Sequence, residues 1–546
     1  MIETHAASAY SYPLLIKHLL YTPLACNPDQ EIVSADTMRY DYRTLHSRIG
    51  RLASGLAALG VSQGDTVAVM DWDNHRYLEC FFAIPMMGAV LHTINIRLSP
   101  EQILYTINHA QDDVILVHAD FLPIVEQIRH RFERPTKLVL LREGSEPELA
   151  EPCAIEYEAM LATANAEFEF KDFDENLPAT TFYTTGTTGD PKGVFYSHRQ
   201  LVLHTLSILA GLGTGDTSSR FHRGDVYMPI TPMFHVHGWG MPYAATLMGV
   251  KQVYPGRYEP AVLLNLIERE GVTFSHCVPT ILHMLLTAPE ANAIDLSNWK
   301  VVIGGSAFPR GMAKEAAERG INAFTGYGLS ETCPVLTIAD MSGIHEVSLD
   351  EESLARRCKT GQPMVMVDLR VVDADMNEVA HDGESTGEVV VRTPCLTQGY
   401  TGNAQGSEAL WQGGYLHTGD VGHIDKHGSL QITDRIKDVI KSGGEWISSL
   451  ELEDIVSRCD GVGEVAAFGI PDQQWGERPM LVIVRTQESK LSVSEIQDAI
   501  REQVDKGRLS KWAIPERVEF VESLPKTSVG KMDKKVLRVT YGNNTA

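Results

Sequence analysis

Short apolar runs alternate with helical patterns through most of the chain. The clearest runs are rich in Val, Ile and Leu and lie at residues 66–70, 114–117, 137–140 and 301–303. Strands that alternate with helices in this way are typical of α/β layers, in which most strands pair in parallel. The pattern therefore predicts a large domain of the α/β class.

The most apolar run, at residues 81–91, is interrupted by Pro85 and Gly88. It is much shorter than the roughly 20 residues that a membrane-spanning helix needs. We predict that this run is a buried helix and that the chain has no membrane span.

The pattern changes after residue 360, where strand-like runs follow one another closely with glycine-containing turns between them. These runs lie at residues 366–372, 387–391 and 429–432. Such spacing is typical of antiparallel pairing. It predicts a small β-barrel-like subdomain over residues 361–433.

A second change, after residue 434, introduces a compact α+β pattern. A helix at residues 449–458 begins with Ser449 and carries acidic residues in its first turns, as helix N-termini prefer. Strand patterns at 465–470 and 480–484 flank a turn that begins at Pro471. We therefore predict three parts, which are a large N-terminal domain at 1–433, a polar hinge linker at 434–438 and a small C-terminal domain at 439–546.

The charge balance limits the choice of partners. Lys and Arg total 47 against 71 Asp and Glu, which gives a formal net charge of -24 at pH 7. Such a surface repels phosphate backbones, so we expect no nucleic-acid partner. The eight cysteines include no C-x-x-C pair, and the first residues lack the pattern of a secretory signal. Both features favour a cytoplasmic protein with reduced thiols.

The sharpest local signal is the segment Y-T-T-G-T-T-G-D-P-K-G at residues 183–193, which follows a strand-like run at 179–183. Glycines let the main chain approach a bulky anion, threonine hydroxyls donate hydrogen bonds and a lysine supplies positive charge. A Walker-type P-loop would need Ser or Thr directly after the lysine, whereas Gly193 stands there. A plain Gly/Thr-rich surface turn is the other alternative. The predicted phosphate-binding residues are Thr184, Thr185, Gly186, Thr187, Thr188, Gly189 and Lys192.

At this segment the sequence resembles the adenylate-forming superfamily, which includes acyl-CoA synthetases, nonribosomal-peptide adenylation domains and firefly-type luciferases. The resemblance recurs in order along almost the whole chain and is closest to the fatty-acyl-CoA synthetases, with the related methylthiopropionate–CoA ligases beside them. It implies an AMP-binding domain followed by a mobile C-terminal lid. It also implies ATP, Mg2+ and CoA as co-substrates or cofactors, with a carboxylic acid as the second substrate.

The resemblance places the nucleotide on segments 304–309 and 325–332. It implies that Gly305, Ser306 and Ala307 line the adenine pocket and that Tyr327, between Gly326 and Gly328, stacks on the base. Thr332 would touch the α-phosphate, and Glu331 would hold magnesium with Thr184; one carboxylate and one hydroxyl suit this hard cation. Outside this motif, a lone loop Glu is usually only solvated. Asp420 would bind both ribose hydroxyls, and Arg435 would contact ribose and phosphate.

The same resemblance places the acid near residues 232–240. His235 would adjoin the acyl carboxylate and phosphate, and Trp239 would be a wall or gate of the acyl pocket, together with Gly304 and Pro334. A zinc site on His235 and His237 is disfavoured because no third ligand stands at a suitable spacing. Trp239 could instead fill core. Close relatives carry Asn-Ala where this chain has His237-Gly238, so the acyl chain length stays open.

The C-terminal part carries the remaining expectations from the resemblance. Lys437 lies at the hinge position, and Gly443, Gly444 and Trp446 would form the path for the pantetheine arm of CoA. Lys531 would be the catalytic lysine that bridges the attacking carboxylate and the α-phosphate, acting with Glu331, Lys192 and His235. The alternatives are a surface charge run at 434–438, a plain turn at the Gly-Gly pair and an inert C-terminal lysine.

The resemblance implies an acid–thiol ligase that forms an acyl-adenylate and then a CoA thioester, with rotation of the C-terminal domain between the two steps. A medium- or long-chain fatty acid is the expected substrate. A short-chain or methylthiopropionate–CoA ligase, a carrier-loading adenylation domain, a luciferase-type oxygenase and a non-catalytic nucleotide-binding sensor are the alternatives. Close relatives form dimers, so a homodimer is compatible with the resemblance.

Overall fold

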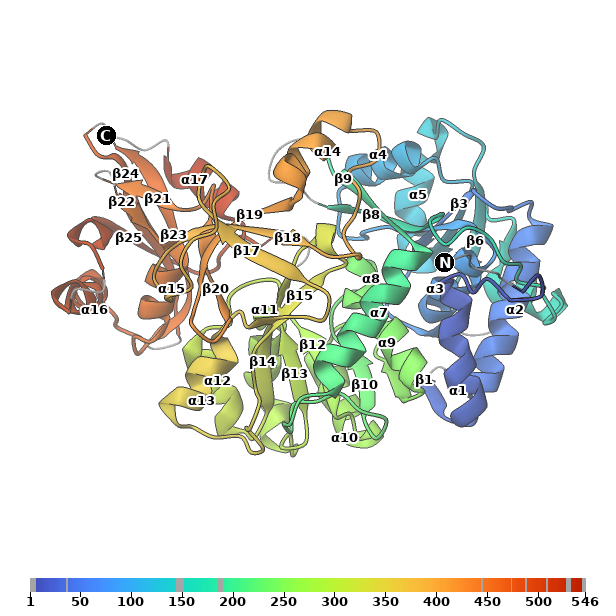
Figure 1. Ribbon diagram of the computed structural model, residues 1–546, viewed down its shortest axis with the longest axis horizontal. Helices are drawn as coiled ribbons and strands as arrows, with labels where there is room; N and C mark the ends of the chain where they lie inside the picture. Colours follow the sequence, from blue (N-terminus) through green and yellow to red (C-terminus); the bar gives the residue numbers. More distant parts are fainter. Residues whose placement is uncertain are drawn as a thin grey trace.

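The computed structural model describes residues 6–35, 38–143, 152–184, 190–442, 445–472, 474–486, 489–506, 509–526 and 532–542. Figure 1 shows a large body, coloured from blue to orange, with a smaller unit at one side that runs from orange to red. The predicted fold class, a large α/β N-terminal domain followed by a small C-terminal domain, is confirmed.

The first sheet of the large body has seven strands in the order β7-β6-β5-β3-β4-β8-β9. All neighbours pair in parallel except β8 and β9, which form an antiparallel pair. The strands are β3 (Thr66–Met70), β4 (Val90–Thr93), β5 (Val114–His118), β6 (Lys137–Leu141), β7 (Ile155–Glu156), β8 (Pro178–Thr184) and β9 (Lys192–Ser197). The helices of this part are α2 (Tyr42–Ala58), α3 (His75–Met86), α4 (Pro100–Ala110), α5 (Leu122–Ile128), α6 (Tyr157–Thr163) and α7 (His198–Gly213).

The second sheet has nine strands in the order β16-β15-β14-β13-β12-β10-β11-β1-β2, and its central strands pair in parallel. The strands are β1 (Glu31–Ser34), β2 (Met38–Asp41), β10 (Val226–Pro229), β11 (Lys251–Tyr254), β12 (Phe274–Cys277), β13 (Lys300–Ile303), β14 (Asn322–Gly328), β15 (Val335–Ile338) and β16 (Gln362–Pro363). The helices are α1 (Tyr21–Cys26), α8 (Val236–Trp239), α9 (Met241–Met248), α10 (Pro260–Glu270), α11 (Pro279–Leu286), α12 (Arg310–Glu318) and α13 (Glu351–Cys358).

The prediction of one buried helix over residues 81–91 is only half right. Every residue of α3 is buried, but the helix ends at Met86 and β4 begins at Val90. Gly88 has a φ of +82°, a left-handed conformation that a glycine adopts readily and that turns the chain into the strand. The apolar run is continuous because helix and strand are both buried.

The predicted antiparallel unit is confirmed, as a four-stranded sheet in the order β17-β18-β19-β20. Its strands are β17 (Asp368–Val372), β18 (Gly387–Arg392), β19 (Leu416–Ile424) and β20 (Leu430–Arg435), and α14 (Ala404–Leu410) lies between β18 and β19 in the chain. In this order β17 and β20 do not pair with each other, so the unit is an open sheet rather than a closed barrel, and Leu430 at the start of β20 bridges to Gly361 instead. Residue 433, the predicted domain limit, falls inside β20, which continues to Arg435.

The C-terminal unit is α+β, as predicted. Its strands are β21 (Ile440–Ser442), β22 (Glu445–Ile447), β23 (Val462–Asp472), β24 (Gly476–Arg485) and β25 (Arg517–Val521), and its helices are α15 (Ser449–Ser457), α16 (Val493–Asp505) and α17 (Lys534–Gly542). The turn predicted at Pro471 begins after Asp472 instead. Pro471 and Asp472 still pair with Glu477 and Gly476, so the hairpin is longer than the apolar pattern.

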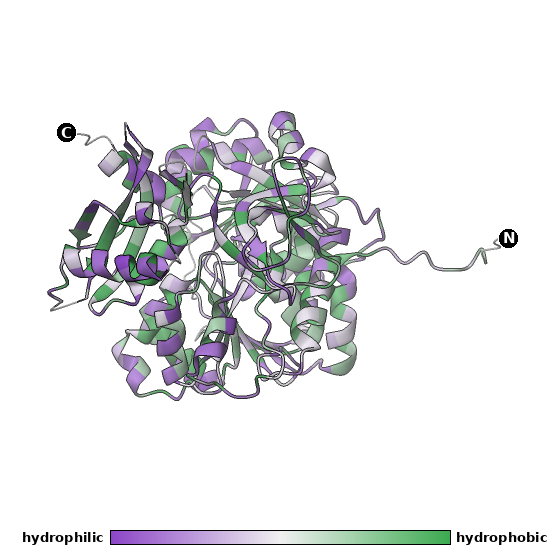
Figure 2. Ribbon diagram, turned by 60° about the vertical axis from the view of Figure 1, so that its left-hand side comes forward, coloured by the Kyte–Doolittle hydropathy of each residue, from purple (hydrophilic) through white to green (hydrophobic). Residues whose placement is uncertain are grey.

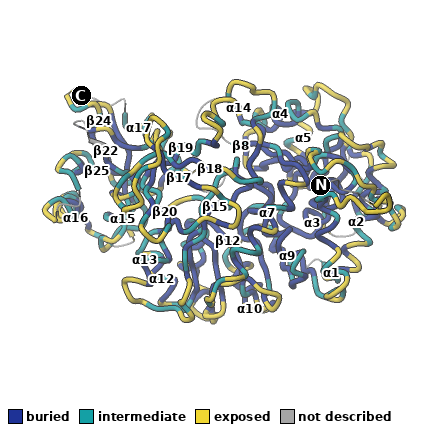
Figure 3. The backbone as a smooth tube through the Cα atoms, viewed as in Figure 1, coloured by how far each residue is buried: buried dark blue, intermediate teal, exposed yellow. Residues whose placement is uncertain are grey.

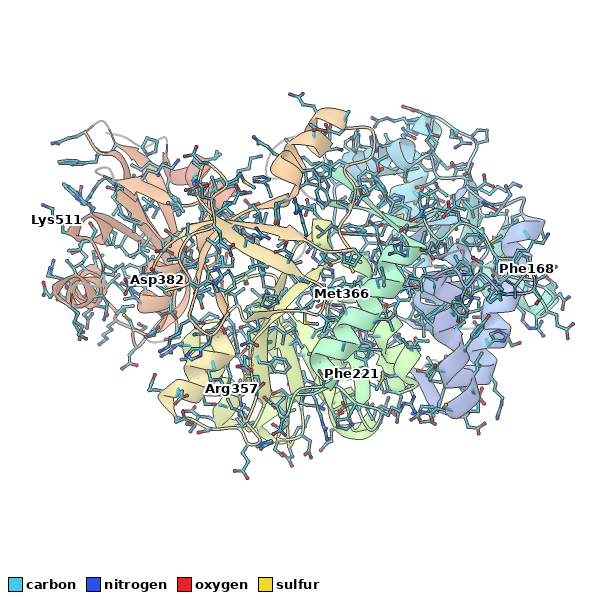
Figure 4. The ribbon with its side chains drawn as sticks, in the orientation of Figure 1. Phe168, Phe221, Arg357, Met366, Asp382 and Lys511 are labelled. Carbon is cyan, nitrogen blue, oxygen red and sulfur yellow. The ribbon has the colours of Figure 1, made fainter. Side chains whose placement is uncertain are left out.

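Burial follows the layers. Figure 2 shows hydrophobic residues concentrated on the strands and on the inner faces of the helices, and Figure 3 shows the same strands as the buried part of the chain. Arg357 of α13 (Figure 4) is 1% exposed and donates from Nη1 to Asn322 Oδ1 at 2.6 Å, which ties α13 to the start of β14. None of the helices described is long and apolar enough to cross a membrane. The eight cysteines all lie among the described residues, and none of them forms a disulfide there.

Candidate active site

A cavity of about 1350 Å³ lies between the large body and the C-terminal unit. It opens at the carboxyl ends of β8, β13 and β14, where loops leave the parallel strands, as is usual for ligand sites in α/β sheets. From the sequence-predicted site residues, those that line it are Thr184, Lys192, His235, Gly305, Ser306, Ala307, Gly326, Tyr327, Gly328, Glu331, Asp420, Arg435 and Lys437. The topology therefore brings together residues that are far apart in the sequence.

The phosphate side of the cavity is built on the β8–β9 pair, in which Thr184 lies opposite Lys192. The Nζ atom of Lys192 lies 4.6 Å from the centroid of the Tyr400 ring. The Tyr400 hydroxyl donates to Glu331 Oε1 at 2.8 Å. Lys192 and Glu331 are thus joined through Tyr400. The predicted residues 185–189 of the loop lie outside the described residues.

Tyr400 was missed by the sequence analysis. Its position follows from a loop contact, because Thr401 donates its backbone N–H to the Gly193 carbonyl at 2.9 Å. Burial and the Glu331 carboxylate raise the pKa of the Tyr400 phenol, which therefore remains a protonated donor. The only sequence signal is a Gly-Tyr pair at 399–400, which has no motif character by itself.

The adenine side is lined by two chain segments without large side chains. Gly305, with a φ of +83°, turns the chain after β13, and Ser306 and Ala307 follow it along the cavity wall. On β14, a Cβ atom at Gly328 would lie 1.7 Å from the Pro334 carbonyl oxygen. Glycine is thus required at residue 328 by close packing.

The ribose side centres on Asp420, which is 2% exposed. Its Oδ2 atom accepts a hydrogen bond from the Tyr327 hydroxyl at 2.7 Å, and its Oδ1 atom lies 2.9 Å from Arg435 Nε. Burial and Asp420 raise the pKa of Tyr327, so its phenol stays neutral. Each carboxylate oxygen has a second lone pair, which leaves acceptor capacity for a diol.

Glu388 of β18 is a second residue that the sequence analysis missed. Its Oε2 atom lies 2.9 Å from His417 Nδ1, and its Oε1 atom accepts the backbone N–H of Gly419 at 3.1 Å. Glu388 therefore fixes the strand and turn that lead into Asp420, although only the fold places it beside them.

Thr332 and Pro334 lie behind the cavity wall rather than on it. The Thr332 hydroxyl accepts the Leu329 N–H at 2.9 Å and donates to the carbonyl of Pro334. The side chain is fully buried and closes the loop after β14. A contact of Thr332 with the α-phosphate remains a prediction.

The acyl side is closed by Trp239. Its indole is 7% exposed, its ring centroid lies 5.1 Å from that of His276, and a Cβ atom at Gly304 would lie 2.9 Å from its Cη2 atom. Trp239 and Gly304 are thus in contact, as the predicted acyl pocket requires, but the indole covers the glycine. Only His235 of the predicted acyl residues lines the cavity itself.

Trp239 stands on a left-handed turn. Residues 236–240 all have φ between +48° and +73°, and the turn includes the non-glycine residues Val236, His237 and Trp239. Such a conformation costs roughly 1–2 kcal/mol for each non-glycine residue. The turn is held by packing, since a Cβ atom at Gly240 would lie 2.8 Å from His204 Nδ1.

His237 points into this packing rather than toward His235. Its ring is fully buried among Phe81, Phe182 and Tyr196, with centroids 6.2, 5.1 and 5.9 Å away. Both ring nitrogens lack a hydrogen-bond partner in the described part of the chain. Burial, aided by His204 and His235, lowers the pKa of His237 to about 3, so the imidazole is neutral. Among the described residues no group of three or more His, Cys, Asp or Glu could hold a metal ion.

Oxygen groups suited to magnesium are nevertheless present in the cavity. Glu331 offers a carboxylate and Thr184 a hydroxyl, and both line it. Magnesium usually takes one or two protein oxygens and completes its shell with water and phosphate oxygens. The two residues fit such a site.

The C-terminal unit contributes described residues to the cavity lining. Lys531, Gly443 and Gly444 lie outside the described residues. Met532 and Asp533, which follow Lys531, line the cavity, whereas β21, which precedes Gly443, contributes none of the described lining residues. Trp446 lies in β22, opposite Lys441. Lys437 lies in the turn after β20, and burial and Arg435 lower its pKa.

Comparison with known proteins agrees with this geometry. The AMP-binding enzyme family model matches residues 22–401, and the AMP-binding enzyme C-terminal domain matches residues 451–531. A long-chain-fatty-acid–CoA ligase of Thermus thermophilus is 41% identical over 521 residues, covering 94% of this chain and 93% of the relative. A 3-methylmercaptopropionyl-CoA ligase of Ruegeria lacuscaerulensis is 37% identical over 534 residues, covering 96% and 97%.

Solved structures share the fold. The crystal structure of an anthranilate CoA ligase in complex with anthranoyl-AMP superposes with a TM-score of 0.85 at 23% identity, covering 97% of this chain and 98% of the other. With two family models that together span most of the chain, and with relatives that match it along nearly its full length, the chain belongs to the AMP-binding enzyme family.

Proposed function

We propose that the cavity joins a carboxylic acid to AMP and then passes the acyl group to CoA. The chain is an AMP-forming acid–thiol ligase, an acyl-CoA synthetase. In the first half-reaction a carboxylate oxygen attacks the α-phosphorus of ATP, and the bond to pyrophosphate breaks. In the second, the CoA sulfur attacks the acyl carbon and AMP leaves. Neither step requires a covalent bond to the protein.

The protein groups have separate tasks in this proposal. Asp420 accepts the ribose hydroxyls while Tyr327 and Arg435 hold its carboxylate. Lys192 offsets phosphate charge, and Tyr400 orients the Glu331 carboxylate. Magnesium, held by Glu331 and Thr184, would neutralise charge on the phosphates when bound. Lys531, which adjoins the cavity-lining Met532, serves as the positive group between the acid and the α-phosphate.

One observation carries the proposal, which is that Lys192, Glu331 and Asp420 line a single cavity together with residues of the C-terminal unit. The test is to give the purified protein ATP, magnesium, CoA and a panel of C3 to C18 acids and to measure AMP and pyrophosphate. Acid-dependent release of both is expected. If no acid of the panel gives AMP, the proposal is wrong.

The main candidate for the acid is a medium- or long-chain fatty acid. The position of Trp239 supports a second candidate, a short acid such as a methylthio-substituted propionate, because the indole covers Gly304 at the predicted acyl pocket. A short acid fits in front of the indole, whereas a long chain requires the indole to move. The acid panel separates the two by the chain length that gives the highest kcat/KM.

A further inference from the structure

A buried carboxylate of the large body accepts a hydrogen bond from the C-terminal unit, across the turn that joins the two parts of the molecule. Asp434 belongs to β20 of the large body, where it pairs with Val421 of β19. Its side chain is 2% exposed, and its Oδ2 atom accepts the backbone N–H of Ser449 at 2.6 Å. Ser449 is the first residue of α15 in the C-terminal unit, and an anion at a helix N-terminus is stabilised by the helix dipole.

A second bond crosses the turn next to the first. The Ser448 hydroxyl donates to the backbone carbonyl of Thr433, so two consecutive residues of β20 bond to two consecutive residues at the start of α15. Thr433, Asp434 and Ser448 line the cavity. The contact is therefore at the edge of the predicted active site.

Lys534 extends this contact to α17. Its Nζ atom donates to Ser449 Oγ at 2.6 Å and lies 2.8 Å from Glu453 Oε1. Burial raises the pKa of Asp434, and the positive charge of Lys534 offsets part of this rise. Lys534 follows Met532 and Asp533, the cavity-lining neighbours of Lys531. Asp434 of the large body is thus connected, through Ser449 and Lys534, to α17, the helix that begins three residues after Lys531.

The two sides of the contact belong to parts that the turn at residues 436–438 joins. Thr433 and Asp434 are fixed in the antiparallel sheet, whereas Ser448, Ser449 and Lys534 move with the C-terminal unit. A large rotation about the turn separates donor from acceptor, because hydrogen bonds weaken steeply with distance and angle. These bonds therefore exist in only one arrangement of the two parts, the one in which Met532 faces the cavity.

We propose that Asp434 is a positioning residue that holds the C-terminal domain in the arrangement for acyl-adenylate formation and releases it for thioester formation. This inference rests on the proposed function. Asp434 acts on the reacting groups only indirectly, because it fixes the positions of α15 and α17. Its loss should therefore lower the rate of one half-reaction and leave the rate of the other unchanged.

The experiment measures the two half-reactions separately in the full chain, with the acid that gives the highest kcat/KM. Adenylation is followed as pyrophosphate release with hydroxylamine as the acyl acceptor, and thioester formation as CoA ester made from supplied acyl-AMP. Asp434→Ala should lower the kcat of adenylation about tenfold, which is the scale of one charge-assisted hydrogen bond to a helix end. Thioester formation from acyl-AMP should stay within about twofold of the wild type.

Matched variants distinguish positioning from general damage. Asp350→Ala removes an exposed carboxylate from the N-terminus of α13, where it accepts the Ser353 N–H at 2.8 Å within the large body, and should leave the ratio of the two rates unchanged. Asp434→Asn keeps an acceptor oxygen and should restore part of the adenylation rate. Ser448→Ala removes the neighbouring bond to Thr433 together with the N-cap bond that Ser448 Oγ accepts from the Glu451 N–H, and should shift the ratio in the same direction by a smaller factor.

Each outcome bears on one claim. If Asp434→Ala lowers both half-reactions equally, or neither, while its thermal unfolding stays cooperative, Asp434 has no positioning role. If Asp434→Ala does not fold, Asp434→Asn and Ser448→Ala decide the question by the same ratio. A wild-type protein that is inactive in both half-reactions contradicts the proposed function itself, not this inference.

Discussion

The nucleotide side and the acyl side of the cavity are built by different forces. On the nucleotide side Asp420 is bonded to Tyr327 and Arg435, and Glu331 to Tyr400. On the acyl side Trp239 is held by ring packing on a left-handed turn. Hydrogen bonds between fixed groups have one good geometry, whereas packed rings can rearrange at lower cost. The comparison teaches that the nucleotide side is built for one ligand and that the acyl side can adapt.

The largest expected effect breaks the nucleotide side. Asp420→Ala removes the proposed acceptor of the ribose hydroxyls and leaves Tyr327 and Arg435 without their shared partner. We expect kcat/KM for ATP to fall about a hundredfold, about 2.7 kcal/mol, with the order of preference among acids unchanged. Steady-state kinetics across the acid panel measure both quantities.

The control for this variant is Asp425→Ala. Asp425 lies in the loop between β19 and β20 and does not line the cavity, although Lys359, whose Nζ atom lies 2.5 Å from Asp425 Oδ2, does. Its removal breaks this partly exposed ion pair and two backbone bonds within its own loop, and should change kcat/KM for ATP by less than about threefold. Equal losses in the two variants would show that the sheet, and not the ribose contact, is damaged.

The next effect tests the adaptable side. Trp239→Ala removes the indole that covers Gly304, and we expect the kcat/KM ratio of a C12 acid to a C4 acid to rise about thirtyfold. This is about 2 kcal/mol, the contribution of two to three methylenes that become buried where the indole was, at about 0.8 kcal/mol each. The KM for ATP should stay within about twofold, because no nucleotide contact is altered. An unchanged C12-to-C4 ratio together with a raised KM for ATP would show that Trp239 affects the nucleotide side and not the choice of acid.

A smaller effect concerns the link between Lys192 and Glu331. Tyr400→Phe keeps the ring beside Lys192 and removes the hydroxyl that donates to Glu331. We expect kcat for adenylation to fall about tenfold, because a hydrogen bond to a charged group contributes about 1.5 kcal/mol. Tyr415→Phe is the matched control, since its hydroxyl donates to Asp368 Oδ2 at 3.1 Å outside the cavity. If both variants keep full activity, Tyr400 does not orient Glu331.

The smallest expected effect concerns stability and pH. The pKa of His237 is lowered to about 3 in the folded protein, so below pH 6.5 the unfolded chain binds a proton that the folded chain does not. Wild-type stability is therefore lost as the pH falls from 6.5 toward 3. In His237→Phe this loss is absent, and the variant should gain about 1.4 kcal/mol relative to the wild type between pH 7.5 and pH 5.5.

Urea unfolding at several pH values measures this change independently of any constant offset that the substitution causes. The comparison with one variant isolates His237 from His198, His204 and His276, which are also buried and whose pKa is also lowered to about 3. A difference between variant and wild type that is the same at pH 7.5 and pH 5.5 would contradict a neutral, unpartnered His237.

The sequence predicted the strands and helices well where one local pattern served one element. Thr66–Met70 is a strand in which three of the five residues are β-branched and the last four are apolar and buried, as a buried parallel strand requires. The prediction was wrong at residues 81–91, where a buried helix and a buried strand share one apolar run. The predicted strand before Pro471 was also too short, because the residue at which a hairpin strand ends depends on its pairing with the partner strand.

What the sequence determined by itself is the set of local conformations and the chemistry of the motifs, because both depend on neighbours within a few residues. What only the tertiary structure decided is which groups meet. Tyr400 beside Glu331, Glu388 beside His417 and Asp434 beside Ser449 are pairs separated by 15 or more residues, without a motif to announce them. They meet because the strand order and the chain reversals bring distant segments to one edge of the sheets. A buried polar group must form a hydrogen bond, and the fold decides which partner lies within reach.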